Sequence, residues 1–514
     1  MGLGVDVLVW VGVLAALIAL ASVAVHRSYH HFLERARGPT SAALRRGAVA
    51  TALDALLAPL EQAHPGQSGL CNLLDNPGAF AARSTSAALA GRSLDLMYYI
   101  WRTDLSGWLL IDDLVAAADR GVRVRLLLDD VNVQGYDPTF LALTQHPRIE
   151  VRLFNPIRSR GHWLRRVAEM LLGLSRFNRR MHGKLWIADG RLAILGGRNI
   201  GDTYFGALES HDRDSVDADV MLVGDKVAEV SAVFDGYWNL GLSLPIMALW
   251  PSFHMGMGRF RRRLARHAAE PPALRFRAAA LDGHGPARLT AGLRWTDRVR
   301  LLADPPDKAY GLRSAPWMSE AIASVLTEAR HEVRMTTPYF VPGHGAMEGL
   351  ARLCARGVRV GLLTNALAST DMVVVHGAYR HYRARMLAAG AEVHEFSPPA
   401  KPGRRRDVLH SKVFLIDGQQ ALVGSLNFDL RSATTNTELG LLFEQPELVA
   451  ELAAMYDRLC APDHAQLVTQ GGAGLRWVVA RPGLPGLMAV EPEAPWTRRA
   501  ASWIVGHLPI QAYL

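Results

Sequence analysis

The chain has 514 residues, of which 49% are hydrophobic and 20% charged, and its formal net charge is +9. This length and composition predict two or more globular domains and exclude a largely disordered chain. The positive charge favours an anionic partner, which at this point is a nucleic acid, an anionic lipid surface or a phosphorylated substrate. The cysteines (Cys71, Cys354 and Cys460) are widely spaced, which disfavours a disulfide framework and a thiolate metal site.

The first predicted element is an apolar helix at residues 5–25. Residues 7–25 are 19 uncharged, mostly aliphatic residues, and as a helix they span roughly 28 Å, close to the hydrocarbon thickness of a bilayer. A signal peptide carries basic residues before its apolar run, whereas here only Asp6 is charged. We therefore favour an uncleaved membrane anchor over a signal peptide or a buried core helix. The following residues 26–70 are rich in arginine, so the positive-inside rule predicts that the rest of the chain is cytoplasmic.

Two similar α/β segments follow the basic linker. Residues 92–130 read as a strand, an apolar-periodic helix and a Val/Leu-rich strand, and residues 332–365 repeat this order. Such a crossover is typical of neighbouring parallel strands in a buried sheet. Gly121 and Gly357, which precede the second strands, suit helix C-caps.

The segment between the two repeats loses its periodicity and is rich in Arg, Gly and Pro, as expected of an interdomain linker. The predicted organisation is an anchor at 5–25, a basic linker at 26–70, a first domain at 71–250, an interdomain linker at 251–295, a second domain at 296–465 and a C-terminal interfacial extension at 466–514.

Each half contains one copy of the same histidine–lysine pattern. The two copies, MHGKLWIADGRLAILGGRN and LHSKVFLIDGQQALVGSLN, align without a gap at a constant offset of 228 residues. Chance does not produce two such copies in one chain of this composition. The paired positions are His182 and His410, Lys184 and Lys412, Asp189 and Asp417, Gly196 and Gly424, and Asn199 and Asn427.

Each copy reads as a β-hairpin. The histidine and lysine stand two residues apart, so on a strand they project from the same face. The Asp-Gly pairs that begin at Asp189 and Asp417 predict two-residue turns, and we expect these aspartates to fix the turns rather than touch a substrate. The glycine at the end of the returning strand brings the asparagine back beside the histidine. Two hairpins together offer two nucleophile-or-acid groups and four donors suited to phosphate oxygens.

Lysine is rare in this chain, which makes the motif lysines informative. Only five of the 57 basic residues are lysine, yet both motif positions, 184 and 412, keep it. A compact ammonium fits a tight pocket that the broad fork of arginine does not. A lysine two residues from the histidine would repel a metal cation, so no metal or other cofactor is expected.

These patterns resemble the paired HKD motifs of the phospholipase D superfamily. The flanking segments SLDLMYYIW, LGGRNIGDTYFGA, ADPPDK, PYFVPG, GSLNFDLRS, NTELG and LPIQAYL are similar to bacterial cardiolipin synthases, above all the cardiolipin synthase C subgroup, from about Asp75 to the end. The resemblance implies an α/β fold with two tandem phospholipase D-like domains, mixed β-sheets flanked by helices, in a pseudo-twofold arrangement behind an N-terminal transmembrane helix.

The resemblance also implies an activity. A cardiolipin synthase of this type makes cardiolipin from phosphatidylglycerol and a phosphatidyl donor, which is phosphatidylethanolamine or a second phosphatidylglycerol. One histidine attacks phosphorus and forms a phosphohistidine, while the other protonates the leaving alcohol and then activates the incoming one. The motif lysines and asparagines would hold the phosphoryl oxygens. Neither the nucleophilic histidine nor an accessory protein follows from the sequence.

A nucleophilic imidazole needs an acceptor on its second nitrogen. In the second half the family pattern supplies Glu438 of NTELG, which we expect beside His410. The residue at the same spacing in the first half is Ser210, so DADVMLV aligns with NTELGLL only after an insertion. Asp219 is then the expected partner of His182, with Asp217 and Asp214 as alternatives.

Basic runs with interleaved apolar residues favour an anionic lipid surface as partner over a merely solvated face. Together with the anchor they predict a location in the bacterial inner membrane. They also favour lipid over a nucleic acid substrate, although superfamily nucleases share the motif. A hydrolytic phospholipase D differs only in its acceptor, and a non-enzymatic scaffold is disfavoured because no motif residue is lost. The runs are 158–180, 259–266, 401–406 and 496–510.

Overall fold

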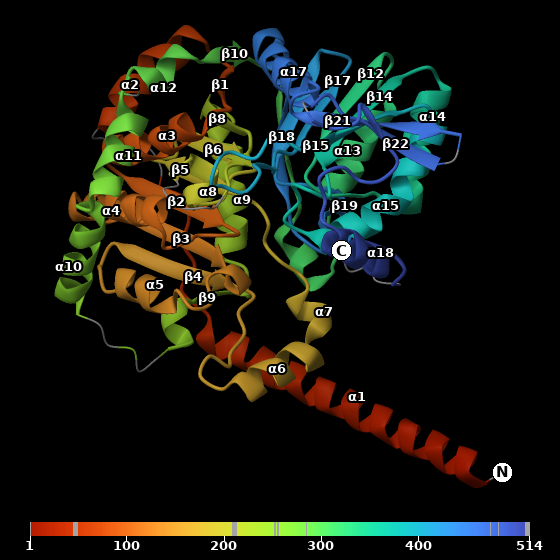
Figure 1. Cartoon of the computed structure of the whole chain (residues 1–514). Coiled ribbons are helices and arrows are strands. Elements are labelled where there is room, and N and C mark those ends of the chain that lie inside the picture. Colours follow the sequence, from red (N-terminus) through yellow and green to blue (C-terminus); the bar gives the residue numbers. More distant parts are fainter. Residues whose placement is uncertain are drawn as a thin grey trace.

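The computed structural model describes residues 2–44, 50–207, 213–250, 253, 256–283, 285–472, 474–481 and 483–508. Two α/β halves lie side by side, and a long N-terminal helix projects from them (Figure 1). The first half extends from α2 to β10 and the second from β11 to α18. The two halves confirm the predicted fold class.

The first half and the helix before it contain α1 (Gly2–Ala36), α2 (Ala52–Ala63), β1 (Ser68–Leu73), α3 (Asn76–Leu89), β2 (Ser93–Tyr98), α4 (Leu105–Asp119), β3 (Arg123–Asp129), η1 (Asp130–Asn132), α5 (Asp137–Leu143), β4 (Ile149–Phe154), α6 (Trp163–Leu172), α7 (Leu174–Phe177), β5 (Leu185–Ala188), β6 (Leu192–Gly196), α8 (Asp202–Phe205), β7 (Ser215–Val216), β8 (Asp219–Gly224), α9 (Val227–Trp238), β9 (Ser243–Pro245), η2 (Ile246–Ala248), α10 (Met257–Ala268), α11 (Pro271–Leu281), α12 (Arg288–Ala291) and β10 (Arg294–Thr296).

The second half contains β11 (Val299–Ala303), η3 (Pro306–Tyr310), α13 (Met318–Thr327), β12 (Glu332–Thr336), β13 (Phe340–Val341), α14 (Gly343–Ala355), β14 (Arg359–Asn365), α15 (Val373–Ala388), β15 (Glu392–Phe396), β16 (Val408–Leu409), β17 (Val413–Ile416), β18 (Gln420–Gly424), β19 (Phe428–Asp429), α16 (Leu430–Thr434), β20 (Leu439–Phe443), α17 (Pro446–Cys460), β21 (Ala465–Gly471), β22 (Gly474–Val478), β23 (Leu487–Met488) and α18 (Trp496–Gly506).

Each half is built on one large mixed sheet. The order in the first is β10-β1-β8-β6-β5-β2-β3-β4-β9, and in the second β11-β20-β18-β17-β12-β14-β15-β21-β22-β23. Strands β2, β3 and β4 are parallel, as are β12, β14 and β15, which matches the predicted crossovers. The motif hairpins β5–β6 and β17–β18 lie antiparallel beside β2 and β12. Both motif hairpins therefore lie at the centre of a sheet, where hydrogen bonds to the strands on either side fix their position.

The two halves share a hydrophobic core. One continuous cluster of buried side chains includes Leu185 and Leu195 from the first motif hairpin and Leu439 and Leu441 from the second half. Strand β6 also contacts β20 across the boundary. Burial of this apolar surface holds the two motif hairpins in one fixed relation.

Helix α1 projects from the first half (Figure 1). Within the described residues, Val9–Ala36 is the one stretch of helix whose length and apolar composition would suffice to cross a membrane. The end nearest the domains is docked, because Tyr29 is buried and its hydroxyl donates to the carbonyl of Pro156 at 2.9 Å. The helix continues to Ala36, so part of the predicted linker at 26–70 is helical.

Two segments differ from their sequence-based description. Residues 251–295 contain α10 and α11, which pack on α3 and α4 of the first half. Phe260 and Leu264, one helical turn apart, are the buried contacts of α10, and its arginines are exposed on the other faces. The C-terminal region extends the second sheet through β21–β23, and α18 packs on α15. Residues 509–514, which include most of LPIQAYL, lie outside the described residues.

Candidate functional site

Both motif histidines lie where the halves meet, each in a short segment that pairs with the other half. The His182 backbone N–H donates to the carbonyl of Thr437 at 2.9 Å, and the His410 N–H donates to that of Val216 at 2.9 Å. Strand β16, just before His410, runs parallel to β7 of the first half. The backbone itself thus crosses between the halves at both histidines.

The side-chain partners cross in the same way. The Nδ1 atom of His182 lies 2.9 Å from Oε2 of Glu438, and Nδ1 of His410 lies 2.6 Å from Oδ2 of Asp217. Each carboxylate belongs to the opposite half from the histidine it contacts. The predicted contacts of Glu438 with His410 and of Asp219 with His182 are therefore wrong. Asp217, an alternative in the sequence, is the aspartate that contacts a histidine.

The strand register explains the error. Gly196 pairs with Asp219 in β6–β8, whereas Gly424 pairs with Gly440 in β18–β20. Asp219 therefore corresponds to Gly440, and Asp217 corresponds to Glu438. The sequence alignment was displaced by two residues. Because side chains alternate along a strand, a displacement of two preserves the apolar pattern and leaves no sign in the sequence.

Asp219 has a structural role in the first half. Its Oδ2 lies 2.8 Å from Arg83 and 3.5 Å from Arg198, and all three side chains are buried. Arg198 also donates to the carbonyls of Leu73 and Asp217. This network fixes the segment from which Asp217 reaches His410.

The motif lysines are buried beside their histidines. Nζ of Lys184 donates to the carbonyl of His182 at 2.5 Å, and Nζ of Lys412 lies against the carbonyl of His410 and 3.2 Å from its Nδ1. Burial and the charge of Lys412 lower the pKa of Lys184 to about 7. Burial also lowers the pKa of Lys412, although Asp217 opposes the shift. Burial of two neighbouring ammonium groups is unfavourable unless an anion neutralises them, so the two lysines predict a bound anion.

The histidines are held in the neutral form. Burial, followed by the charges of Lys184 and Lys412, lowers the pKa of His182 well below its ordinary value. Burial and Lys412 likewise lower the pKa of His410. With Nδ1–H donating to a carboxylate, the Nε2 lone pair of a neutral imidazole is available to attack phosphorus or to accept a proton. Asp217 stays ionised, because His410 and its hydrogen bond outweigh the effect of burial and lower the carboxyl pKa.

The motif asparagines have different surroundings. Asn199 accepts from the Ile100 N–H at 3.1 Å and donates to the Tyr204 hydroxyl at 3.1 Å. Asn427 is 6% exposed, and its Oδ1 has no hydrogen-bond partner in the described part of the chain. Asn199 therefore also holds its own loop in place through these two hydrogen bonds. Asn427 keeps Oδ1 as an acceptor without a partner among the described residues.

The remaining motif residues shape the hairpins. Asp189 and Asp417 both have φ of 54° and precede glycines at 63° and 64°, as a type I′ turn requires. A Cβ on Gly196 or Gly424 would lie within 2.7 Å of neighbouring backbone, so both strands need glycine for close approach. The aspartate carboxylates accept from backbone N–H groups that lead into β2 and β12, namely Gly91, Arg92 and Ser93 in the first half and Arg330, His331 and Glu332 in the second.

Other supporting residues were not predicted as site residues. Asp304 accepts from the Glu438 N–H at 2.9 Å and from Lys308 at 2.8 Å, and this buried pair fixes the start of β20. The rings of Tyr99 and Tyr204 stand edge-on to His182 and His410, with centroids 4.8 and 5.3 Å apart. The rarity of lysine was a usable signal for Lys308, which is completely buried.

The arrangement suits phosphoryl chemistry. Two neutral imidazoles, each oriented by a carboxylate, and two buried ammonium groups lie at one interface. Among the described residues no three His, Cys, Asp or Glu side chains form a group that could hold a metal ion. Side chains of these types are suited to nucleophilic attack, proton transfer and phosphate binding.

Comparison with known proteins agrees with this geometry. The family described as "Cardiolipin synthase, PLD-like domain" matches residues 86–238 and 322–460, one stretch in each half. The chain is 34% identical to cardiolipin synthase C of Escherichia coli (strain K12), over 88% of this chain and 98% of that protein. It is 25% identical to cardiolipin synthase A of Salmonella arizonae, over 75% of this chain and 68% of that protein.

A solved structure supports the fold. The crystal structure of phosphatidylserine synthase from Haemophilus influenzae superposes with a TM-score of 0.56 at 13% identity, covering 89% of this chain and 99% of that one. The two sheets with central motif hairpins, the crossed carboxylate–histidine pairs and the sequence relatives lead to one assignment. The chain belongs to the cardiolipin synthase family of phospholipase D-like proteins.

Proposed function

We propose that this chain is a cardiolipin synthase that transfers a phosphatidyl group to phosphatidylglycerol through a phosphohistidine intermediate. The observation that carries the proposal is the pair of neutral histidines, each oriented by a carboxylate of the opposite half, beside two buried lysines. Similarity to cardiolipin synthases over most of the chain supports the lipid substrate. The donor is phosphatidylethanolamine or a second phosphatidylglycerol.

In the first step, Nε2 of one histidine attacks the donor phosphorus and forms the N–P bond. The phosphate monoanion raises the depressed pKa of the second histidine, which therefore enters this step as the imidazolium. The bond from phosphorus to the headgroup oxygen breaks, and the Nε2 proton of that imidazolium passes to the departing oxygen. In the second step, the same histidine takes the proton of a phosphatidylglycerol hydroxyl, whose oxygen displaces the imidazole. The near-symmetric site serves either assignment of the two roles to His182 and His410.

The motif lysines fit the charge of the intermediate. As phosphorus becomes five-coordinate, negative charge grows on its non-bridging oxygens, and we infer that Lys184 and Lys412 bind these oxygens. Entry of a phosphate monoanion also raises the depressed pKa of Lys184, since an opposite charge nearby stabilises the ammonium. Exclusion of water at the phosphohistidine stage decides between transfer and hydrolysis.

A membrane location supports this substrate class. Residues Val9–Val23 of α1 are mostly exposed, and α6 packs against α1 (Figure 1). On α6, Trp163 is 72% exposed and Leu171 is 69% exposed, amid the arginines of the predicted basic run. An amphipathic helix of this kind lies in the interface of an anionic membrane. We infer that α1 anchors the chain in the inner membrane, α6 lies at its surface, and the catalytic halves are cytoplasmic.

The test is a lipid-product assay. Purified full-length protein receives phosphatidylglycerol, with and without phosphatidylethanolamine, and the lipids are resolved by mass spectrometry. The expected product is cardiolipin, and its dependence on phosphatidylethanolamine identifies the donor. Phosphatidic acid alone would indicate a hydrolytic phospholipase D, and cleavage of added DNA without new lipid would contradict the proposal. His182→Ala and His410→Ala should each abolish turnover, and substantial activity in either would refute the two-histidine mechanism.

A further inference from the structure

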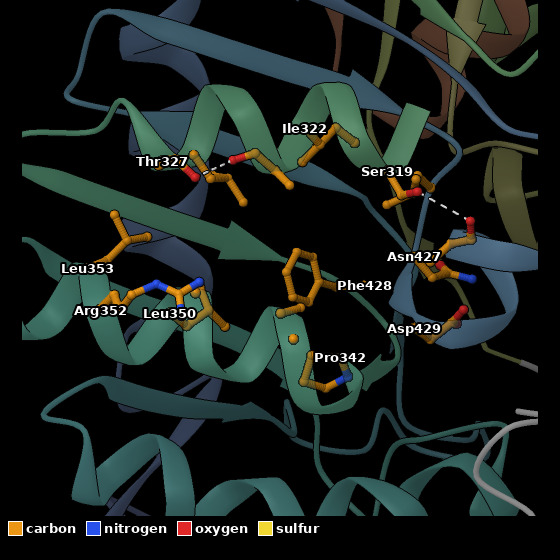
Figure 2. Close-up of a pocket in the computed structure, with 17 residues that line it drawn as sticks. Ser319, Ile322, Thr327, Pro342, Leu350, Arg352, Leu353, Asn427, Phe428 and Asp429 are labelled. Carbon is orange, nitrogen blue, oxygen red and sulfur yellow. Dashed lines mark hydrogen bonds between the residues drawn. The ribbon is translucent and has the colours of Figure 1, made fainter. Parts of the chain in front are cut away.

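The second half contains an apolar groove between α13 and α14 (Figure 2). Its cavity volume is about 240 Å³. Buried side chains such as Ile322, Leu326, Leu350 and Leu353 contribute to its lining. Thr327 and Arg352 lie toward one end of the groove, and Ser319, Asn427 and Asp429 lie toward the other. The groove therefore begins beside the loop that carries the motif residue Asn427 and extends from there toward Thr327 and Arg352.

The first half shows what fills the equivalent space. Helices α3 and α4 flank β2 in sequence as α13 and α14 flank β12, and α11 packs on both α3 and α4. Phe276 of α11 contacts Phe80 of α3, with ring centroids 4.9 Å apart. Arg277 of α11 pairs with Asp113 of α4. A helix of this chain thus covers the first groove, whereas the C-terminal helix α18 of the second half packs on α15.

The sequence of α14 does not favour an equivalent covering helix. At the same distance before Gly121 and Gly357, Asp113 of α4 corresponds to Gly349 of α14. One of the two carboxylates that hold Arg277 of α11, that of Asp113, is therefore missing from α14, whereas the other, that of Asp112, corresponds to Glu348. Gly349 and Ala346 line the groove on this side, and their small size leaves it open. The groove thus suits a thin apolar occupant better than another helix.

Asn427 connects the groove to the reaction site. This side chain is part of the second motif and also lines the groove. It is 6% exposed, and its Oδ1 lacks a partner within the described residues. A buried polar atom without a partner is uncommon and indicates a group that is satisfied when a ligand is bound. A ligand there would place a polar group at Asn427 and an apolar tail along the groove.

We propose that this groove binds one acyl chain of a phospholipid substrate whose phosphate lies between the two histidines. The proposal rests on the proposed function, because it assigns the substrate of the same site. It implies that the lipid is recognised by its apolar tail as well as by its phosphate. Each methylene removed from water adds to affinity, so longer chains should bind better until the groove is full.

The direct test is photolabelling. Full-length protein in detergent is irradiated with phosphatidylglycerol that carries a diazirine on one acyl chain, and the labelled peptides are identified by mass spectrometry. We expect adducts on α13 and α14. Ala346→Phe and Ala323→Phe fill the groove from opposite helices, and because both alanines are exposed the fold should tolerate either change. Loss of about two methylene contacts lowers labelling of these helices about tenfold. Ala450→Phe, at an exposed position on α17, is the matched control and should label normally.

Adducts confined to other elements would refute the proposal that the groove binds an acyl chain. Labelling of α13 and α14 that neither Ala346→Phe nor Ala323→Phe reduces would refute it too. A wild-type oligomer that both variants dissociate would also overturn it, in favour of a second copy of the chain as occupant. The two proposals fail separately. If cardiolipin forms but the adducts lie elsewhere, only the acyl-chain role of the groove is refuted. If the adducts lie in the groove but no cardiolipin forms, only the proposed synthase activity is refuted.

Discussion

The crossed contact between Glu438 and His182 gives the sharpest prediction, which is the effect of Glu438→Gln. The substitution keeps the size of the side chain but replaces the carboxyl group 2.9 Å from Nδ1 of His182 with an amide. Burial raises the pKa of this carboxyl group, and the charge of Lys184 opposes the shift. An amide can also present its NH2 group to this nitrogen, which favours the wrong tautomer of the ring. Turnover should fall while the fold persists, because Ser425 still has an oxygen to bond.

The magnitude follows from the contact. A hydrogen bond to a charged group in a buried site contributes about 1.5–3 kcal/mol. At about 1.4 kcal/mol per factor of ten, its loss lowers the rate about 10- to 100-fold. Asp217→Asn should have an effect of the same order, acting through His410, because its contact is at least as short at 2.6 Å.

The assay is cardiolipin formation together with a double-mutant cycle on the free energy of unfolding. Glu438→Gln is combined in turn with His182→Ala and with His410→Ala. Residues in contact show coupling of about 0.5–3 kcal/mol, whereas independent sites are additive within about 0.5 kcal/mol. We expect coupling of Glu438 to His182 and additivity with His410. Coupling to His410 instead, or wild-type turnover in Glu438→Gln, would refute the crossed arrangement.

Three further predictions concern other parts of the site. Asp219→Asn weakens buried pairs with Arg83 and Arg198 and should lower the free energy of unfolding by about 3–5 kcal/mol, measured by denaturation. Turnover should fall as well, because the same network fixes the segment that carries Asp217. Because the pKa of Lys184 is lowered to about 7, kcat/KM of the wild type should fall as pH rises above about 7. Lys184→Arg should remove this decline and lower kcat/KM at its plateau. A wild-type profile that is flat to pH 9 would contradict this reasoning. Lys184 takes up a proton on unfolding between about pH 7 and pH 10, where its ordinary pKa lies, so the free energy of unfolding should rise over this range. The rise should be smaller in Lys184→Met, in which only Lys412 of the two motif lysines keeps a lowered pKa. Gly424→Ala places a Cβ 2.6 Å from the carbonyl oxygen of Leu439, so it should lower the free energy of unfolding by about 1–3 kcal/mol. An unchanged melting temperature would show that β18 and β20 separate more easily than their geometry implies.

The sequence predicted the parts of the site that local rules determine. The Asp-Gly turns and the apolar second strands each depend on residues close in sequence, and both have the predicted form. The exchange of carboxylates was not predictable in this way, since it depends on how two distant hairpins meet. The choice between Asp217 and Asp219 failed for a related reason, because the two aspartates are two residues apart at the start of β8 and either alignment keeps the apolar pattern of that strand.

The interdomain segment shows another limit. Helix α11 is stabilised by packing on α3 and α4, as when Arg277 reaches Asp113, and not by a strong apolar pattern of its own. Composition alone therefore described the segment as a linker. The rarity of lysine was more informative than any periodicity. Lys184, Lys308 and Lys412 are all buried around the site, whereas Lys226 and Lys401 form ion pairs near the surface.

The crossed histidine contacts have a consequence for the ancestry of the chain. In a symmetric dimer, if a residue of one subunit contacts a second residue of its partner, the reciprocal contact must also exist. His182 with Glu438 and His410 with Asp217 have this reciprocity inside a single polypeptide. An ancestor with one motif could complete such a site only by pairing with a copy of itself, and fusion of two genes would preserve the contact. Severing the chain between the halves should accordingly yield two fragments that are inactive apart and regain activity when they are mixed.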